Sequence, residues 1–210
     1  MRIAILGSGN VGGTLGRKWA IAGHDVAFGV RDVTKGAAAV KGGDALPPGA
    51  RVTSVRDAVQ GAEVLVLATP WAAVDAALRE AAVPAGMIVI DATNPIAPGF
   101  TLDEGANSAS GAERIQAMVP TARVVKAFNT TGFNNMAEPT YDGTKSVMFY
   151  AGNDVPAKQV VHTLVDAIGF EAIDAGALVR SRELEHLALL WIGLAFGGMG
   201  RDFAFRLVRR

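Results

Sequence analysis

In the first thirty residues, two continuous apolar runs are separated by a segment in which apolar residues recur at a helical spacing. An apolar strand at residues 2–6 runs directly into glycines that follow the spacing G-x-G-x-x-G, namely Gly7, Gly9 and Gly12. Apolar residues then recur at a helical spacing, at Val11, Leu15 and Trp19. A second apolar strand covers Val26–Val30. This succession predicts a βαβ unit of the kind that binds a dinucleotide.

The three glycines have separate expected roles in such a unit. Gly7 allows a tight turn, Gly9 lets the backbone come close to a pyrophosphate, and Gly12 lets the helix lie against the sheet. The amides at the start of the helix then point at the phosphates, with the positive end of the helix dipole behind them. The alternative is a strand–turn–helix that simply needs flexible residues.

Strands and helices continue to alternate along the rest of the chain. Continuous apolar runs and β-branched residues predict strands at 51–53, 63–70, 87–94, 124–128, 146–151 and 171–175. Helical spacing and capping signals predict helices near 33–40, 55–60, 71–82, 110–118 and 156–168, and a last one from 181. Residues 95–109 are small, polar and rich in glycine, and are expected to form a loop. The fold class is therefore α/β, a doubly wound parallel sheet of the Rossmann type with a short C-terminal helical extension.

The residues that follow the second strand bear on the choice of dinucleotide. An NAD site usually has an acid there for the ribose 2′-hydroxyl, whereas an NADP site has a cation near the 2′-phosphate. Here Arg31 can present a planar fork to the phosphate and Lys35 can add a point charge. Asp32 lies one place later than a ribose-binding acid normally would, and the alternative is an exposed Arg–Asp pair in a surface turn. The pattern favours NADP.

Polar residues and prolines follow several of the predicted strands. In open α/β sheets, ligands bind beyond the carboxyl ends of the strands, at the topological switch point. That rule selects three segments by position alone: Ala68-Thr69-Pro70, Thr93-Asn94-Pro95 and Ala127-Phe128-Asn129-Thr130. Thr69 and Asn94 have short side chains that can hydrogen-bond ribose or a carboxamide. The alternative for each proline is an ordinary strand-to-helix turn.

Charge and composition exclude several function classes. The chain of 210 residues has 20 basic and 20 acidic residues, so no global field attracts nucleic acid or an anionic membrane. It has no cysteine, and its three histidines are scattered and are expected to be structural. Met1 leads straight into the first strand, and residues 187–200 are too short to span a bilayer. We expect a cytoplasmic protein with no nucleic acid, membrane or metal partner.

The C-terminal helix carries an unusually broad apolar surface. Apolar residues with helical spacing form one stripe, at Leu184, Leu187, Ala188, Trp191, Ile192 and Ala195. Further apolar residues extend around the helix, at Leu189, Leu190, Leu194 and Phe196. A helix that is apolar on nearly all sides is usually buried on more than one side. We therefore expect residues 1–177 to form the NADP-binding domain, and residues 178–210 to pack on it and on a second subunit in a homodimer.

Several short sequence motifs of this chain occur together, in the same order, in one known family. They are Gly7–Gly12, Ala68–Trp71, Val125–Thr130, Asp174–Gly176, Ser181-Arg182 and Phe196–Gly200. In these motifs, over nearly its whole length, the chain resembles the NADP oxidoreductases that depend on a deazaflavin, coenzyme F420. The resemblance implies a Rossmann domain, a small C-terminal helical part, a homodimer, and hydride exchange between NADPH and the deazaflavin. A related module supplies the NADPH-to-flavin step of membrane metalloreductases, so the electron acceptor stays open between a deazaflavin and a flavin.

The resemblance also implies roles for individual residues. It puts Ser8, Gly9, Asn10 and Val11 at the pyrophosphate, and Arg31 and Lys35 at the 2′-phosphate. Ala68, Thr69 and Pro70 line the adenosine and nicotinamide side of the cleft, with Asn94 and Ala127 nearer the nicotinamide. Met199 lies near the acceptor, beside Gly197. The deazaflavin reductases tend to carry His where this chain has Asn129, and Ser where it has Val30.

Hydride transfer needs few side chains. Stacking of the two rings, their alignment and the exclusion of water supply most of the catalysis, so no catalytic side chain is expected. Two other classes compete. Imino-acid and hydroxy-acid reductases share the glycine-rich opening, but they bind their substrate with a large helical domain. This chain has only some 35 residues after its last predicted strand, which we expect to be too few for that domain. An NADP-binding sensor without turnover is the third reading.

Overall fold

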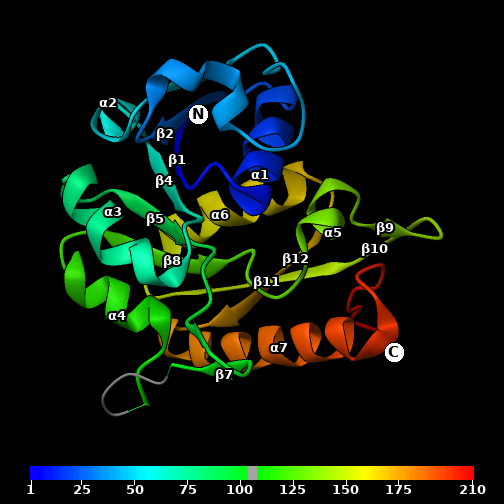
Figure 1. The fold of residues 1–210 in the computed structure, drawn as a ribbon. Helices are drawn as coiled ribbons and strands as arrows, with labels where there is room; N and C mark the ends of the chain where they lie inside the picture. The colour runs from blue at the N-terminus through cyan, green and yellow to red at the C-terminus, as the bar shows by residue number, and fades with distance from the viewer. Residues whose placement is uncertain (104–107) are drawn as a thin grey trace.

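The computed structural model describes residues 1–103 and 108–210, and its centre is an eight-stranded sheet (Figure 1). The strands lie in the order β12-β11-β8-β5-β4-β1-β2-β3. Their bounds are β1 Arg2–Leu6, β2 Asp25–Val30, β3 Ala50–Ser54, β4 Val64–Leu67, β5 Ile88–Asp91, β8 Arg123–Ala127, β11 Val147–Gly152 and β12 Glu171–Gly176. Two small hairpins lie outside it, β6 Ile96–Ala97 with β7 Thr101–Leu102, and β9 Thr140–Tyr141 with β10 Thr144–Lys145.

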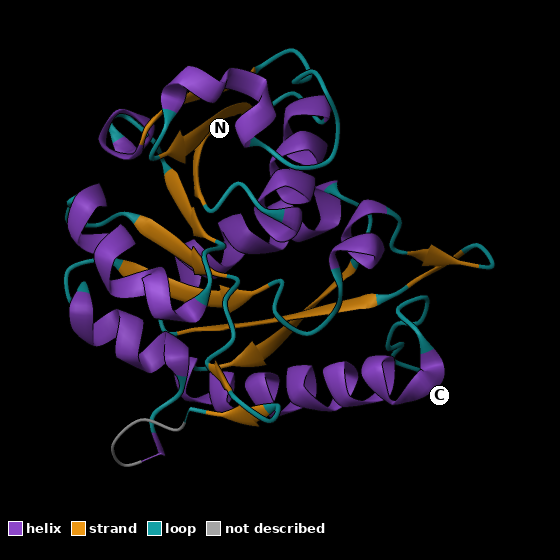
Figure 2. Cartoon of the chain, in the orientation of Figure 1, coloured by secondary structure: helices purple, strands orange, loops and turns teal. Residues whose placement is uncertain are grey.

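Helices cover both faces of this sheet (Figure 2). The α-helices are α1 Asn10–Ile21, α2 Val55–Val59, α3 Val74–Ala81, α4 Gly111–Met118, α5 Phe133–Ala137, α6 Val155–Ala167 and α7 Ser181–Leu194. Shorter helical turns are η1 Val33–Ala39, η2 Trp71–Ala73, η4 Leu178–Arg180 and η5 Ala195–Met199. The alternation of strands and helices predicted from the sequence is confirmed.

Alternate residues of the central strands enter two separate cores. Ile3 and Ile5 of β1 belong to the core that α1 and α6 cover, whereas Ala4 and Leu6 belong to the core that α2, α3 and α4 cover. In the first core, the fully buried Trp19 donates its indole N–H to the backbone oxygen of Leu164, 3.0 Å away, and so ties α1 to α6. Burial of one such side chain contributes about 2–3 kcal/mol. Two covered faces explain why the strands have continuous apolar runs.

The sheet is mostly parallel, with one reversal. β11 runs antiparallel to β8, with Tyr150 opposite Ala127, and β12 runs parallel to β11. The sequence predicts an all-parallel sheet and misses this reversal. Between β8 and β11 the chain makes only the five-residue α5 and the β9–β10 hairpin, which return it at the same edge, whereas a parallel crossover needs a longer connection. The motif Asp174–Gly176 therefore lies at the edge opposite the glycine-rich turn.

Two predicted segments differ in detail from the structure. Within the expected loop 95–109, β6 and β7 pair as a short hairpin, so that prediction is wrong at those positions, and residues 104–107 lie outside the described residues. The expected helix near 33–40 is 3₁₀ in character and is broken at Gly36, whose φ is +52°. Both segments are too short for periodicity to identify them.

The C-terminal helix α7 packs its predicted stripe inward. Leu184, Ala188 and Trp191 are buried, whereas Leu190 and Phe196 are 54% and 60% exposed. Residues 200–210 follow without regular structure and fold back along the end of the sheet, where the N–H of Val147 donates to the carbonyl of Phe205 at 3.0 Å. No helix among the described residues combines the length and the apolar character that crossing a bilayer requires.

Candidate functional site

The turn between β1 and α1 is tightly packed at its first and third glycines and open at its second. A Cβ on Gly7, whose φ is +101°, would lie 2.3 Å from the carbonyl oxygen of Ala68, and one on Gly12 would lie 1.8 Å from that of Gly7. A Cβ on Gly9 would meet no described atom within 4 Å. The first and third glycines are therefore required by packing, and space is left above Gly9, as the predicted roles require.

The start of α1 is free to bind an anion. Gly9 is its N-cap and offers no side-chain oxygen, and no acidic residue lies in its first turn. The amides of Asn10, Val11 and Gly12 therefore have no partner within the helix. Unsatisfied N–H groups at the positive end of a helix dipole form a ready site for phosphate.

A loop that follows η1 closes over this turn. The N–H of Lys41 donates to the carbonyl of Ser8 at 2.9 Å, and Arg17 of α1 donates to the carbonyls of Lys41 and Gly43. The Lys41 side chain is exposed and pairs with no other described residue. Sequence reasoning missed Lys41 because its partner Ser8 lies 33 residues earlier in the chain.

Arg31 and Asp32 do not form the pair that the surface-turn interpretation requires. Asp32 accepts hydrogen bonds from the hydroxyl and the N–H of Thr34, at 2.6 and 3.1 Å, and Lys35 lies 3.9 Å away. The Thr34 hydroxyl and the charge of Lys35 lower the pKa of Asp32. Arg31 is exposed and makes no hydrogen bond or ion pair with the described residues.

Arg31 nevertheless lies beside the glycine-rich turn. Leu6 is paired with Gly29 in neighbouring parallel strands, so the turn at Gly7 and the residues after Val30 leave the sheet at the same edge. A free guanidinium at this edge can bind a 2′-phosphate without first giving up another partner.

The ends of β4, β5 and β8 also meet at this edge. Thr69 follows β4, and its buried hydroxyl has no hydrogen-bond partner among the described residues. Asn94 and Asn129 bind each other: the Asn129 amide donates to the side-chain oxygen of Asn94 at 3.0 Å, and the Asn94 amide donates to the Asn129 carbonyl at 2.9 Å. The side-chain oxygen of Asn129 is buried and has no partner in the described part of the chain. Two unpaired polar oxygens here fit a ligand rich in hydrogen-bond donors.

The other predicted residues are placed differently. Pro70 is exposed and Ala68 is half-buried, so both reach the surface beside Thr69. Ala127 is fully buried within the sheet, so its side chain does not reach that surface. Phe128 follows with a φ of +63°, unusual for a bulky residue, and turns the chain toward Asn129. Met199 is 60% exposed in η5, and no hydrogen bond links it to the strand ends.

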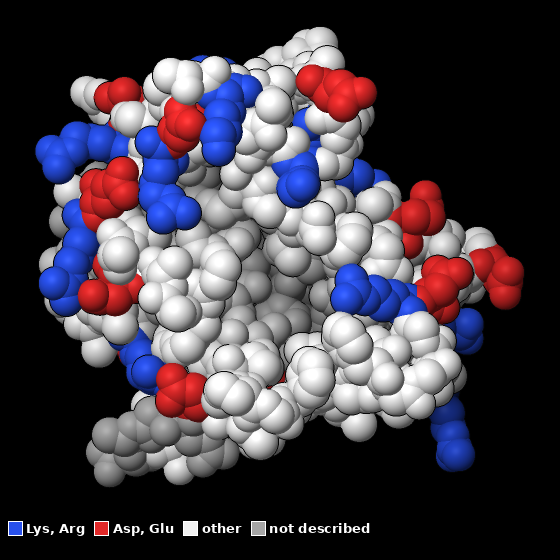
Figure 3. Space-filling model, viewed as in Figure 1, with Lys and Arg blue, Asp and Glu red and all other residues white. Residues whose placement is uncertain are grey.

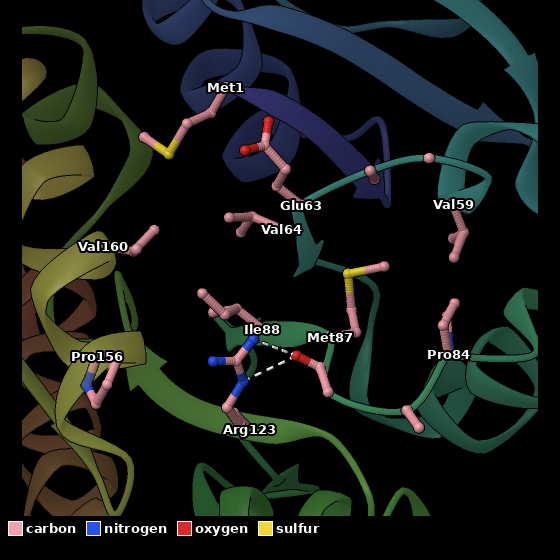
Figure 4. A pocket seen from close by; sticks show the side chains of 14 residues that line it. Met1, Val59, Glu63, Val64, Pro84, Met87, Ile88, Arg123, Pro156 and Val160 are labelled. Carbon is pink, nitrogen blue, oxygen red and sulfur yellow. Dashed lines mark hydrogen bonds between the residues drawn. The ribbon is translucent and has the colours of Figure 1, made fainter.

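The molecular surface is hollowed where these strand ends face (Figure 3). The hollow lies between α1 and α7 as seen in Figure 1, its centre shows uncharged side chains, and basic side chains lie along its upper rim. A separate cavity of about 600 Å³ lies at the opposite edge of the sheet, between Met1, Glu63, Met87, Arg123 and Val160 (Figure 4). That cavity is remote from the glycine-rich turn and takes no part in the candidate site.

A buried ionic cluster lies at the same ends of β5 and β8. Lys126 of β8 is fully buried, and its ammonium donates to Asp91 at 2.9 Å, to Glu185 at 2.7 Å and to the carbonyl of Thr93 at 2.7 Å. Burial alone would lower the pKa of Lys126, but the charges of the two carboxylates and their hydrogen bonds raise it. Glu185 belongs to α7, but its side chain turns inward and is buried, and the sequence did not predict this cluster. The sequence signal that could have indicated this cluster is Lys126 itself, a lysine inside the apolar strand predicted at 124–128.

Comparisons with known proteins agree with this geometry. The sequence profile of the family described as NADP oxidoreductase, coenzyme F420-dependent, matches residues 2–95. A crystal structure of a protein from Arthrobacter sp. FB24, provisionally assigned as an F420-dependent NADP reductase, is 34% identical, with a TM-score of 0.87 over all of both chains. A hypothetical protein, SMa0349 from Sinorhizobium meliloti, is 29% identical with a TM-score of 0.73, over 86% of this chain and 87% of that one.

A more distant relative is considerably longer. Metalloreductase STEAP3 from Rattus norvegicus is 29% identical over 188 residues, which make up 90% of this chain. The chain spans only 36% of the length of that relative.

Proposed function

This chain belongs to the family of coenzyme F420-dependent NADP oxidoreductases, and from that premise we propose that it transfers a hydride between NADPH and a deazaflavin or flavin acceptor. The observation that carries the proposal is the open space above Gly9, at a sheet edge where, among the described residues, the first amides of α1 have no partner within the helix and the Arg31 guanidinium is unpaired. A dinucleotide with a 2′-phosphate has anionic groups for both.

Phosphate binding is assigned to the glycine-rich turn and its rim. Ser8, Gly9, Asn10 and Val11 bind the pyrophosphate through backbone amides, with Gly7 and Gly12 shaping the turn. Arg31 and Lys35 bind the 2′-phosphate, and Lys41 adds a third cation at the same rim.

The ring-binding part of the site is assigned to the strand ends. Thr69, with Ala68 and Pro70, lines the wall that follows β4, and the unpaired side-chain oxygen of Asn129 accepts from the carboxamide of the nicotinamide. Asn94 holds Asn129 in position through their mutual hydrogen bonds. When bound, the nicotinamide supplies a hydride to the acceptor ring, and the chain itself orients the two rings and excludes water. The acceptor side is bordered by η5, including Met199.

One assay separates the proposed reaction from its alternatives. NADPH oxidation is followed by absorbance with coenzyme F420, FMN, FAD, a ferric chelate, a cyclic imine and a 2-oxo acid, each supplied separately. Turnover with the deazaflavin or a flavin supports the proposal. Turnover only with the imine or the oxo acid assigns the chain to the other reductase class. NADPH binding without turnover on any acceptor indicates a sensor.

We propose a homodimer through exposed apolar side chains of α7 and of η5, which follows it. Leu190 and Phe196 are both more than half exposed, and the Phe196 ring packs against the exposed Phe100 with centroids 5.2 Å apart. Exposed apolar side chains that adjoin one another are typical of a protein interface. A twofold dimer would cover them and would border the acceptor side of the hollow.

A further inference from the structure

A lysine and two carboxylates occupy the interior beneath the strand ends. The side chains of Lys126 and Asp91 are fully buried, and that of Glu185 is 3% exposed. One ammonium faces two carboxylates, so the cluster has a formal charge of −1. The N–H of Gly111, at the start of α4, donates to the second oxygen of Glu185 at 3.1 Å. That helix terminus offsets part of the negative charge, and no second cation contacts the two carboxylates within the described residues.

The cluster is joined to both asparagines of the candidate ring site. Lys126 donates to the carbonyl of Thr93, the residue before Asn94, and Asn129 donates to the carbonyl of Leu184, the residue before Glu185, at 3.1 Å. Asn129 lies three residues after Lys126 in the chain. At about 3.8 Å per residue, a ring held at Asn129 would lie about 10 Å from the cluster.

Stability alone is a weak reason for such a cluster. Buried ion pairs lose solvation that their attraction only partly restores, and well-packed apolar side chains of similar volume often serve the fold as well or better. A buried excess charge does, however, act strongly on a charge that changes nearby, because little water screens it. The oxidised nicotinamide ring is cationic and the reduced ring is neutral.

We propose that the Lys126–Asp91–Glu185 cluster tunes the bound cofactor, its excess negative charge stabilising the oxidised nicotinamide over the reduced one and so making bound NADPH a stronger hydride donor. This inference rests on the proposed function. The three residues act on the cofactor through their charge and through the residues they position, because none of them touches the ring. Asp91 also orders the strand end, since it accepts from the N–H and hydroxyl of Thr93 at 2.9 and 2.7 Å.

The test measures two dissociation constants, independently of turnover. Glu185→Gln removes one unit of negative charge with little change in shape. Coulomb's law for a unit charge at about 10 Å, with an effective dielectric constant of about 20 to about 40, predicts that Kd for NADP⁺ divided by Kd for NADPH rises about fourfold or more. A fourfold rise in this ratio corresponds to a rise of about 18 mV in the reduction potential of the bound NADP⁺/NADPH couple. The matched control is Glu183→Gln on the same helix, whose exposed carboxylate pairs with Arg180, and it leaves the ratio unchanged.

The possible outcomes are distinct. A wild-type protein that binds neither NADPH nor NADP⁺ refutes the proposed function itself. A wild type that binds both, with a ratio that changes less than twofold in Glu185→Gln, overturns the tuning role alone. If Glu185→Gln does not fold, Asp91→Asn makes the same charge change from β5 and is expected to raise the ratio in the same direction. If neither variant folds, the cluster is structural and the inference is overturned.

Discussion

Replacement of Arg31 by alanine is expected to remove most of the preference for NADPH over NADH. Arg31 has no partner among the described residues, so the substitution breaks no contact of the free protein, and its stability changes by less than about 0.5 kcal/mol. The whole effect then falls on binding. Charge-assisted hydrogen bonds to a phosphate contribute about 1.5–3 kcal/mol, and the exposure of Arg31 favours the lower end. The expected loss is about 10-fold to 30-fold in NADPH affinity.

The assay is calorimetric titration of NADPH and NADH into both proteins. NADH lacks the 2′-phosphate, so its Kd is expected to change less than about twofold. Arg206→Ala is the matched control, because Arg206 is also exposed and unpaired among the described residues but lies in the C-terminal segment. Higher salt is expected to reduce the wild-type preference, since it screens an exposed charge pair. Equal Kd values for NADPH and NADH in the wild type, or an unchanged ratio in Arg31→Ala, would refute the reasoning.

Three further predictions concern the turn, the helix pair and the dimer. Gly9→Val is expected to abolish NADPH binding with the fold intact, because its side chain fills open space that the pyrophosphate needs; Gly193→Val, also in open space, should bind normally, and normal NADPH titration of Gly9→Val would place the site elsewhere. The Arg182 guanidinium, which donates to Glu113, lowers the pKa of that carboxyl below 4.5, so its stabilisation is present above pH 4.5 and is lost as the pH falls through the folded-state pKa. Glu113→Gln should therefore lower the free energy of unfolding by about 0.5 kcal/mol at neutral pH, allowing for screening, and should leave it unchanged at acid pH. Thermal unfolding of Glu113→Gln and of the control Glu80→Gln tests this, and a loss of stability in Glu113→Gln that persists at acid pH contradicts it. Leu190→Glu should convert a dimer to a monomer in light scattering, while Val155→Glu, at a position that is also apolar and more than half exposed in the wild type, should not; a monomeric wild type at micromolar concentration rejects the dimer.

Local sequence patterns determined most of the architecture. The βαβ unit at residues 2–30 and the helix near 110–118, which begins with a capping box of Ser110 and Glu113, are present where the sequence predicts them. Each depends on residues within a few positions of one another, and their apolar period or hydrogen bonding fixes the local conformation whatever the remote chain does. The candidate residues at strand ends were also predictable, because parallel strands end at one edge.

Contacts between distant residues were decided only by the tertiary structure. Asn94 meets Asn129 across 35 positions, and Lys126 meets Glu185 across 59. The reversal of β11 depends on how a short connection returns the chain, and Ala127 is buried because its side chain enters the core that α1 and α6 cover. No period in the sequence encodes such partners, since they follow from which elements pack together. A lysine in an apolar strand shows that a counter-charge must exist, because an unpaired buried charge is too costly, but only the packing of α7 against the sheet shows that Glu185 provides it.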